Sequence, residues 1–199
     1  MNPLKSILGT IVTGIVLAVI IILVMGRAGA VNPWEFWVWV HVLVGIAWIG
    51  LLYYFNFVQV PAVATALGDE GGPGPAGINK YVAPRALLWF RYAALLTWIT
   101  GALALEAMHQ ADGSGFVAAF TFAEGYKLIG MGAWLGTIML FNVWVLIWPN
   151  QQKILGMKEA SAEEIAKAKF VALMASRTNT MLSIPMILGM TAQGHGLPF

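Results

Sequence analysis

Long apolar runs without charges are the feature that most limits what this chain can fold into. Residues 4–25 carry one charged side chain, Lys5, and four further apolar stretches follow. About 20 apolar residues in a row can cross a bilayer as one helix. We therefore expect an all-α integral membrane bundle with five membrane helices. Their predicted bounds are about 4–26, 33–60, 84–109, 124–148 and 170–194.

The charge content agrees with a lipid bilayer as the main surroundings of the chain. Of 199 residues, 10% are charged and 59% are hydrophobic, whereas about 25% of the residues in a soluble domain are charged. The 11 basic and 9 acidic residues leave a net charge of +2, which is too little for a nucleic-acid-binding face. Soluble, disordered and nucleic-acid-binding proteins are excluded.

The sequence contains no cysteine. This absence excludes disulfides, iron–sulfur clusters, thiolate metal sites and covalently attached haem c. Any iron bound by this chain must therefore take histidine, methionine or oxygen ligands.

The first apolar run imitates a secretory signal, because Lys5 precedes it and Ala28-Gly29-Ala30 follows it. Its length of about 20 residues exceeds a usual signal core, so we interpret it as an uncleaved membrane helix. Residues 7–25 are apolar all round, which predicts a peripheral position. We find no internal repeat and expect one membrane domain over residues 1–199.

The distribution of lysine and arginine predicts the orientation, because these residues accumulate on the cytoplasmic side of membrane proteins. With the N-terminus in the cytoplasm, nine of them lie inside and two outside. The inner set is Lys5, Lys80, Arg85, Arg91, Lys153, Lys158, Lys167, Lys169 and Arg177; the outer set is Arg27 and Lys127. We expect the N-terminus inside and the C-terminus outside.

All three histidines fall toward the outer side in this topology: His41, His109 and His195. A helix that starts at Pro33 places His41 about 12 Å along it, and ionisable groups inside spans point to function. Facing helices commonly hold haem b with a pair of imidazoles. For His109, an ordinary position in the membrane interface is the simpler interpretation.

We predict that His41 and His195 are the axial ligands of one haem b, with His109 as the alternative. His41, Gly45 and Trp48 share a helix face through their i, i+4, i+7 spacing. A glycine one turn from the histidine suits either a flat macrocycle or close helix packing. Among outer cations, Arg27 and Lys127 are available to pair with the haem propionates.

A second polar group is predicted near the inner side. It comprises Tyr54, Asn56, Arg85, Arg91, Asn142, Arg177 and Asn179. Arg91 lies about two turns inside its helix, so we expect it to bond with Asn142, with Asn179 or with carbonyls freed by Pro185. The cluster is either a structural lock between helices or a site for an anion or a quinone headgroup.

Four strings of the sequence resemble the N-terminal membrane domain of the bacterial urate oxidase/urate hydroxylase family. They are WVHVLVGIAWIGLLYYFNFVQVP, APRALLWFRYAALLTWITG, NVWVLIWPNQQKI and SRTNTMLSIPMILGMTAQGH, and the likeness extends over about residues 33–198. The positions that match the family strings are His41, Trp48, Asn56, Arg85, Trp89, Arg91, Asn142, Trp144, Arg177, Asn179, Pro185 and His195.

The resemblance implies a multi-pass protein of the bacterial inner membrane with a small helical bundle and associated haem. Longer relatives oxidise urate and pass electrons to an attached c-type cytochrome domain, for which this cysteine-free sequence has no counterpart. An electron-transfer protein that uses a separate periplasmic cytochrome or a quinol is our first interpretation. The alternatives are a urate hydroxylase component with a separate acceptor and a non-catalytic accessory subunit of a larger respiratory or oxidase complex.

The predicted topology is tested by cysteines introduced one at a time, as Pro75→Cys and Gly113→Cys. A membrane-impermeant thiol reagent added to whole cells should label position 113 and spare position 75, because 75 lies in a predicted cytoplasmic loop. Labelling at position 75, or protection at position 113, would overturn the orientation.

Overall fold

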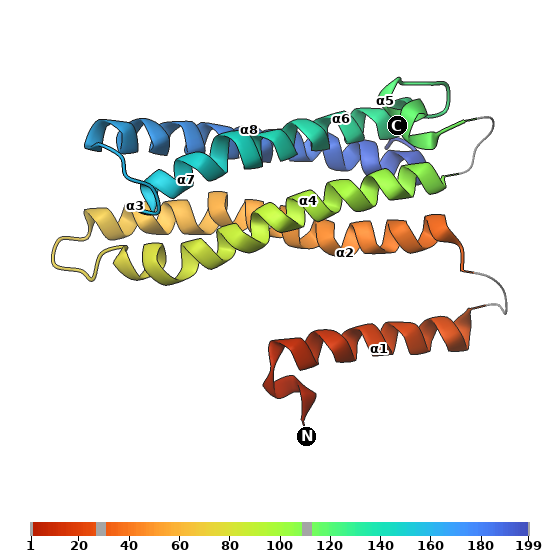
Figure 1. Ribbon diagram of the computed structural model, residues 1–199, viewed down its shortest axis with the longest axis horizontal. Helices are drawn as coiled ribbons and strands as arrows, with labels where there is room; N and C mark the ends of the chain where they lie inside the picture. Colours follow the sequence, from red (N-terminus) through yellow and green to blue (C-terminus); the bar gives the residue numbers. More distant parts are fainter. Residues whose placement is uncertain (1, 27–30, 109–112, 199) are drawn as a thin grey trace. The chain divides into compact units, whose positions relative to one another are not determined.

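The structure is a computed structural model that describes residues 2–26, 31–108 and 113–198. The chain divides into two compact units, Met1–Asn32 and Pro33–Phe199, and helices are the regular elements of the described residues (Figure 1). The first unit holds the short 3₁₀ turn η1 (Pro3–Lys5) and α1 (Ile7–Met25). The Ser6 hydroxyl caps α1 by accepting a hydrogen bond from the Gly9 N–H at 3.0 Å.

The second unit is a bundle of four long helices that run alternately in opposite directions (Figure 1). The first long helix consists of α2 (Pro33–Tyr54), η2 (Phe55–Gln59) and α3 (Val60–Gly68), and the second consists of η3 (Ile78–Val82) and α4 (Ala83–Ala107). The third consists of α6 (Lys127–Phe141), η4 (Asn142–Ile147) and α7 (Trp148–Ile154), and the fourth is α8 (Ala162–His195). The short α5 (Gly115–Phe120) lies between α4 and α6 in the sequence.

Three of these long helices contain a π-helical segment directly before a proline. Pro61, Pro84 and Pro149 each occupy the second position of the α-helical segment that follows. Proline has no N–H and its ring crowds the carbonyl of the preceding turn, and a π turn adds the residue that relieves this conflict. The helices therefore continue past the predicted ends at 60 and 148 and begin before the predicted start at 84.

By length and composition, four helices in the described part of the chain could cross a membrane: Ile7–Met25, Pro33–Gly68, Ile78–Ala107 and Lys127–Ile154. The predicted fifth span, 170–194, lies within α8, which is long enough but more polar than these four. Several of its polar side chains bond to other helices. Ser176, Asn179 and Ser183 contact Asn56, Asn142 and Tyr53 in this way.

The core of the second unit forms where α2 packs along α4 and α6 packs along α8. Trp48, Leu52, Phe90, Met139 and Val143 are its largest apolar members with almost no exposed surface. Their burial removes apolar side chains from contact with either water or lipid, so dense packing fixes how the four helices fit together.

Backbone contact between glycines brings α6 and α8 together. A Cβ atom added at Gly189 would lie 2.9 Å from the Gly132 nitrogen, and one added at Gly132 would lie 3.1 Å from the Met190 nitrogen. Small residues allow helices to approach this closely. Gly136, one turn after Gly132, has open space beside it instead.

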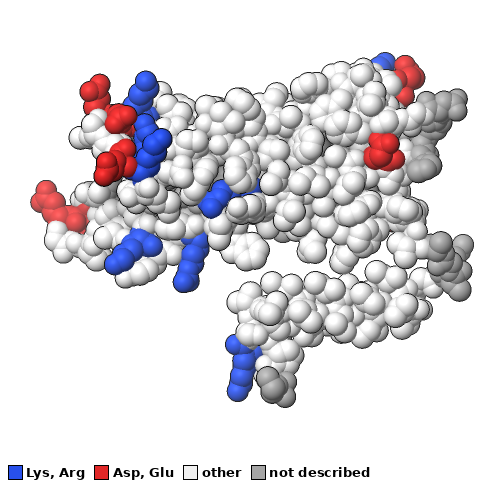
Figure 2. Space-filling model, in the orientation of Figure 1, with Lys and Arg blue, Asp and Glu red and all other residues white. Residues whose placement is uncertain are grey.

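Charged side chains gather at one end of the second unit. Figure 2 shows most of its Lys, Arg, Asp and Glu atoms at the end where the α3–η3 and α7–α8 connections lie. There the Lys153 ammonium pairs with Glu164 at 3.3 Å. The Ser161 backbone N–H, with help from Lys153, lowers the pKa of Glu164, and Ser161 and Glu164 form the capping box that starts α8.

The glycine contact predicts a sharp difference between two single-methyl additions. Gly189→Ala should destabilise the bundle by about 1–3 kcal/mol, the usual cost of overpacking, because the new methyl group meets the backbone of α6. Gly50→Ala is the matched control, since a Cβ at Gly50 meets nothing within 4 Å. Thermal unfolding in detergent measures both variants, and equal melting temperatures would contradict the close contact.

Candidate functional site

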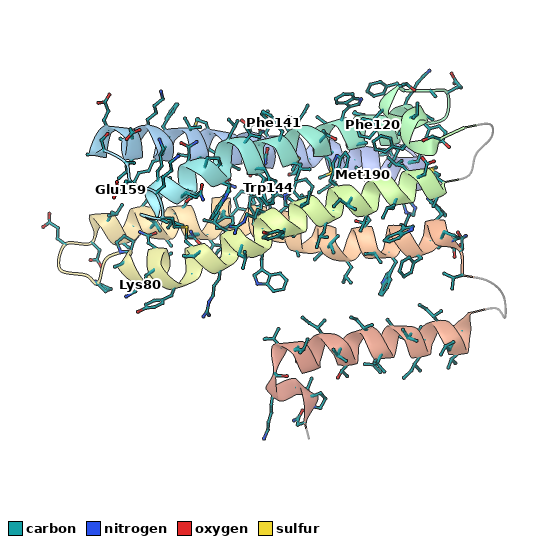
Figure 3. All side chains as sticks on the ribbon, in the orientation of Figure 1. Lys80, Phe120, Phe141, Trp144, Glu159 and Met190 are labelled. Carbon is teal, nitrogen blue, oxygen red and sulfur yellow. The ribbon has the colours of Figure 1, made fainter. Side chains whose placement is uncertain are left out.

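A partly open cavity of about 540 Å³ lies near the end of the second unit opposite the charged end (Figure 2). Its walls come from the first turns of α2, the last turns of α4, α5, the start of α6 and the last turns of α8. Figure 3 shows two of its lining residues, Phe120 and Met190, at this end. The volume falls within the range of about 300–1,000 Å³ that small-molecule and cofactor sites occupy.

His41 lines this cavity with a fixed ring orientation. Its Nδ1 atom lies 2.8 Å from the carbonyl oxygen of Thr97 on α4. A carbonyl oxygen only accepts, so Nδ1 carries the proton and Nε2 of the neutral imidazole keeps its lone pair. A metal-bound histidine usually has such a second hydrogen bond, which fixes its tautomer and its orientation.

Gly101, rather than Gly45, provides the space for the His41 ring. A Cβ atom at Gly101 would lie 2.9 Å from Cε1 and 3.0 Å from Nδ1 of His41, whereas one at Gly45 would meet Thr97 Cγ2 at 3.6 Å. Gly45 therefore lies at the contact of α2 with α4, as the helix-packing alternative expects, and it is not a lining residue. The sequence did not predict Thr97 and Gly101 as neighbours of His41. Their i, i+4 spacing, which places them on one face of α4, is the pattern that could have indicated it.

His195, the last residue of α8, is exposed and lines the same cavity. The Tyr53 and Ser183 hydroxyls lie 3.0 Å apart and align α2 with α8. His41 precedes Tyr53 by twelve residues and His195 follows Ser183 by twelve. Because the two helices are antiparallel, both histidines lie about 18 Å from that contact in the same direction. The structure thus brings His41 and His195 to one cavity and to one level of the bundle.

Trp48 supplies an unused hydrogen-bond donor among the cavity-lining residues. The residue is 2% exposed, and its Nε1 atom has no partner among the described residues. A buried donor without a partner costs about 1–3 kcal/mol, which a ligand with an acceptor atom would recover. It lies two turns deeper than His41 along α2.

The structure does not place the remaining predicted cofactor-binding residues in the lining of the cavity. Lys127 begins α6, is exposed and pairs with Glu124 at 3.4 Å; it is not a lining residue. Arg27 and His109 lie outside the described residues. At the mouth, Gln193 lines the cavity, and its side chain donates to the Gly125 carbonyl at 2.8 Å.

The predicted inner polar cluster contains one compact pair. Asn142 Nδ2 donates to Asn179 Oδ1 at 2.8 Å, and Asn179 Nδ2 donates to the Met139 carbonyl at 3.0 Å. Asn179 is 0% exposed. Asn56 belongs to a separate contact, in which it donates to the Ser176 hydroxyl at 2.8 Å.

The structure does not bring the predicted arginines to these amides. Arg91 stacks its guanidinium over the Trp148 ring, with 3.7 Å from Cζ to the ring centre. Arg85 and Arg177 are exposed. The α2 hydroxyl that reaches α8 belongs to Tyr53 rather than Tyr54. The polar contacts that Tyr53, Asn56 and Asn142 make with α8 are therefore neutral amide and hydroxyl pairs.

Taken together, these observations describe a helical bundle with membrane-like helices and a histidine-lined cavity. Residues 111–199 match the sequence model of the family described as urate oxidase N-terminal. The match confirms the resemblance over α5 to α8, which contribute His195, Asn142 and Asn179. No curated protein and no solved structure matches the chain.

Removing one amide of the Asn142–Asn179 pair should lower the stability of the bundle, whereas removing an exposed arginine charge should not. Asn179→Leu should cost about 1–3 kcal/mol, because it leaves buried groups of Asn142 and Met139 without a partner. Arg177→Gln, two residues away on α8 and exposed, should stay within about 0.5 kcal/mol of the parent. Unfolding in detergent measures both; a smaller effect for Asn179→Leu would show that the pair is dispensable.

Proposed function

We propose that this chain is a haem-b-binding integral membrane protein of the urate-oxidase N-terminal type, which exchanges electrons with a separate redox partner. The observation that carries the proposal is the pair of histidines, His41 and His195, at one level of one cavity. The family match over residues 111–199 supports the same class of protein.

The residues present fit a haem in four respects. The cavity is largely apolar, as a porphyrin requires, and its volume is of the right order. His41 has the second hydrogen bond expected of a ligating imidazole. Gly101 leaves room beside the ring. His195 stands at the open end, where polar substituents of a ligand would reach the surface.

In this proposal each side chain has a defined task. Thr97 holds the proton of His41 on Nδ1 and so reserves Nε2 for coordination. His195 offers the second imidazole from the end of α8. When bound, haem b supplies one-electron exchange, and two histidine ligands favour this over oxygen chemistry because no open position remains. Trp48 offers its N–H to an acceptor atom at the inner end of the cavity.

We further propose that α8 is a fifth span, with the N-terminus in the cytoplasm and the C-terminus outside the bacterial inner membrane. Ser176, Asn179 and Ser183 of α8 have partners within the bundle, so lipid need not solvate them. The cavity end would then face the periplasm, where a c-type cytochrome is a suitable electron partner. The charged end would face the cytoplasm, in agreement with the usual lysine and arginine bias.

A urate hydroxylase component is the second candidate, and the family match is the observation that favours it. Such a component would need a separate electron acceptor. Urate consumption by the purified chain with an added acceptor such as cytochrome c tests this directly. Turnover that persists in a His41→Ala variant would separate urate chemistry from the histidine pair.

Absorption spectra of single histidine variants test the haem proposal. The parent protein should show a Soret band and a pyridine haemochrome spectrum of haem b. His41→Ala and His195→Ala should each abolish or shift the reduced spectrum, and His109→Ala should leave it unchanged. If the first two variants keep the parent spectrum, or the third alone abolishes it, the ligand assignment is wrong; a parent without haem would favour the accessory-subunit alternative.

Gly101→Ala offers a milder test that leaves both histidines in place. The added methyl group would overlap the His41 ring, so haem occupancy should fall by about tenfold or more while the helical content stays constant. Gly50→Ala is the matched control, because it lies outside the cavity lining and a Cβ there meets nothing within 4 Å. Equal occupancy in the two variants would remove Gly101 from the site.

A further inference from the structure

A second hollow lies on the side of the bundle, between α4 and the α6–η4 segment. This lateral groove measures about 500 Å³ and is lined by Leu95, Trp98, Thr137, Leu140, Phe141 and Trp144. Its indole N–H groups are already used: Trp98 donates to the Thr137 hydroxyl at 2.8 Å and Trp144 to the Arg91 carbonyl at 3.2 Å. A ligand therefore meets an apolar surface. Figure 3 shows Phe141 and Trp144 midway along the bundle.

Arg91 stands next to one end of this groove. Leu95 follows it by one turn of α4, and the indole of Trp144 is bonded to its carbonyl oxygen. The guanidinium lies over the ring of Trp148, one turn beyond Trp144. The rings of Tyr92 and Trp148 thus flank the positive charge.

No carboxylate of the described residues neutralises Arg91. The ion pairs there are Lys127–Glu124 and Lys153–Glu164. Arg91 is half-buried and belongs to the membrane-like helix Ile78–Ala107, where an unpaired charge is costly. It lies about 9 Å deeper along α4 than the exposed Arg85, on the side of the bundle's charged end.

We propose that the lateral groove binds one anionic phospholipid. The guanidinium of Arg91 donates hydrogen bonds to the phosphate, and one acyl chain lies in the groove against Leu95, Trp98 and Phe141. A single anionic lipid satisfies both features, because arginine and phosphate form strong charge-assisted hydrogen bonds and the groove accepts only apolar atoms. An apolar helix of a partner would cover the groove but leave the charge of Arg91 unpaired. The site shares Trp98 with the wall of the cavity but uses neither histidine.

Native mass spectrometry of the full chain tests this assignment, with added phosphatidylglycerol and phosphatidylcholine of identical acyl chains. The parent should retain one phosphatidylglycerol with a preference of about tenfold over phosphatidylcholine, the scale of one charged hydrogen bond. Arg91→Gln should lose the preference, and Arg91→Lys should keep most of it. Arg85→Gln is the matched control, because it removes the same charge from an exposed position and should keep the full preference.

The groove itself is tested by Leu95→Trp, which fills it while Arg91 remains. This variant should lose retention of both lipids, and glycerol phosphate should not displace lipid from the parent, because it lacks the acyl chain.

The proposal is overturned if the parent shows no preference, if Arg85→Gln loses as much as Arg91→Gln, if glycerol phosphate competes, or if the groove is covered by a second copy of the chain. Circular dichroism and melting temperature confirm that each variant is folded, and the Arg91→Lys and Leu95→Trp measurements decide the question if Arg91→Gln does not fold.

Discussion

The whole bundle depends on one constraint: a polar group inside apolar surroundings must find its partner within the protein. The long helices meet it by pairing with each other. The Asn142 and Asn179 amides bond to one another, the Tyr53 and Ser183 hydroxyls meet across α2 and α8, and the His41 ring bonds to the backbone of α4. These directional contacts select one alignment of helices whose apolar surfaces alone would permit several.

The same constraint makes a polar or charged group without a partner informative, because such a group indicates that a partner is missing. The Trp48 N–H is buried without a partner among the described residues, at the inner end of the cavity. Arg91 has aromatic neighbours but no anion within the described part of the chain. In a bundle that pairs most of its buried polar groups, these two differ from the rest and each lies beside a hollow, whereas the third such group, the buried Oε1 of Gln59, lines neither hollow. The proposals for the cavity and for the lateral groove rest on this contrast.

Much of the architecture could be predicted because apolar run length alone defines membrane-like helices. The all-helical class and four of the spans follow directly from it. The continuation of the helices to Gly68 and Ile154 and the early start at Ile78 could not be predicted, because proline usually marks a boundary and the π turns that absorb Pro61, Pro84 and Pro149 have no recognised sequence signature. The roles of Gly101 and Thr97 depend on which face of α4 meets α2, and local sequence does not contain that contact. The arginines were misplaced for a related reason, since charge alone predicts an amide partner as readily as an aromatic one.

His41 and His195 each lie twelve residues from the Tyr53–Ser183 contact. Their positions in the cavity therefore depend on the lengths of the two helix segments that separate them from that contact. Each residue of an α-helix advances the axis by 1.5 Å and turns it by about 100°. One residue inserted or deleted between His41 and Tyr53 would therefore carry the imidazole out of the cavity wall toward another face of α2, even though every contacting side chain survived. The segment between 41 and 53 and that between 183 and 195 can vary in composition, but their lengths are tied to each other. Relatives that keep this cavity should differ here by substitution and not by insertion.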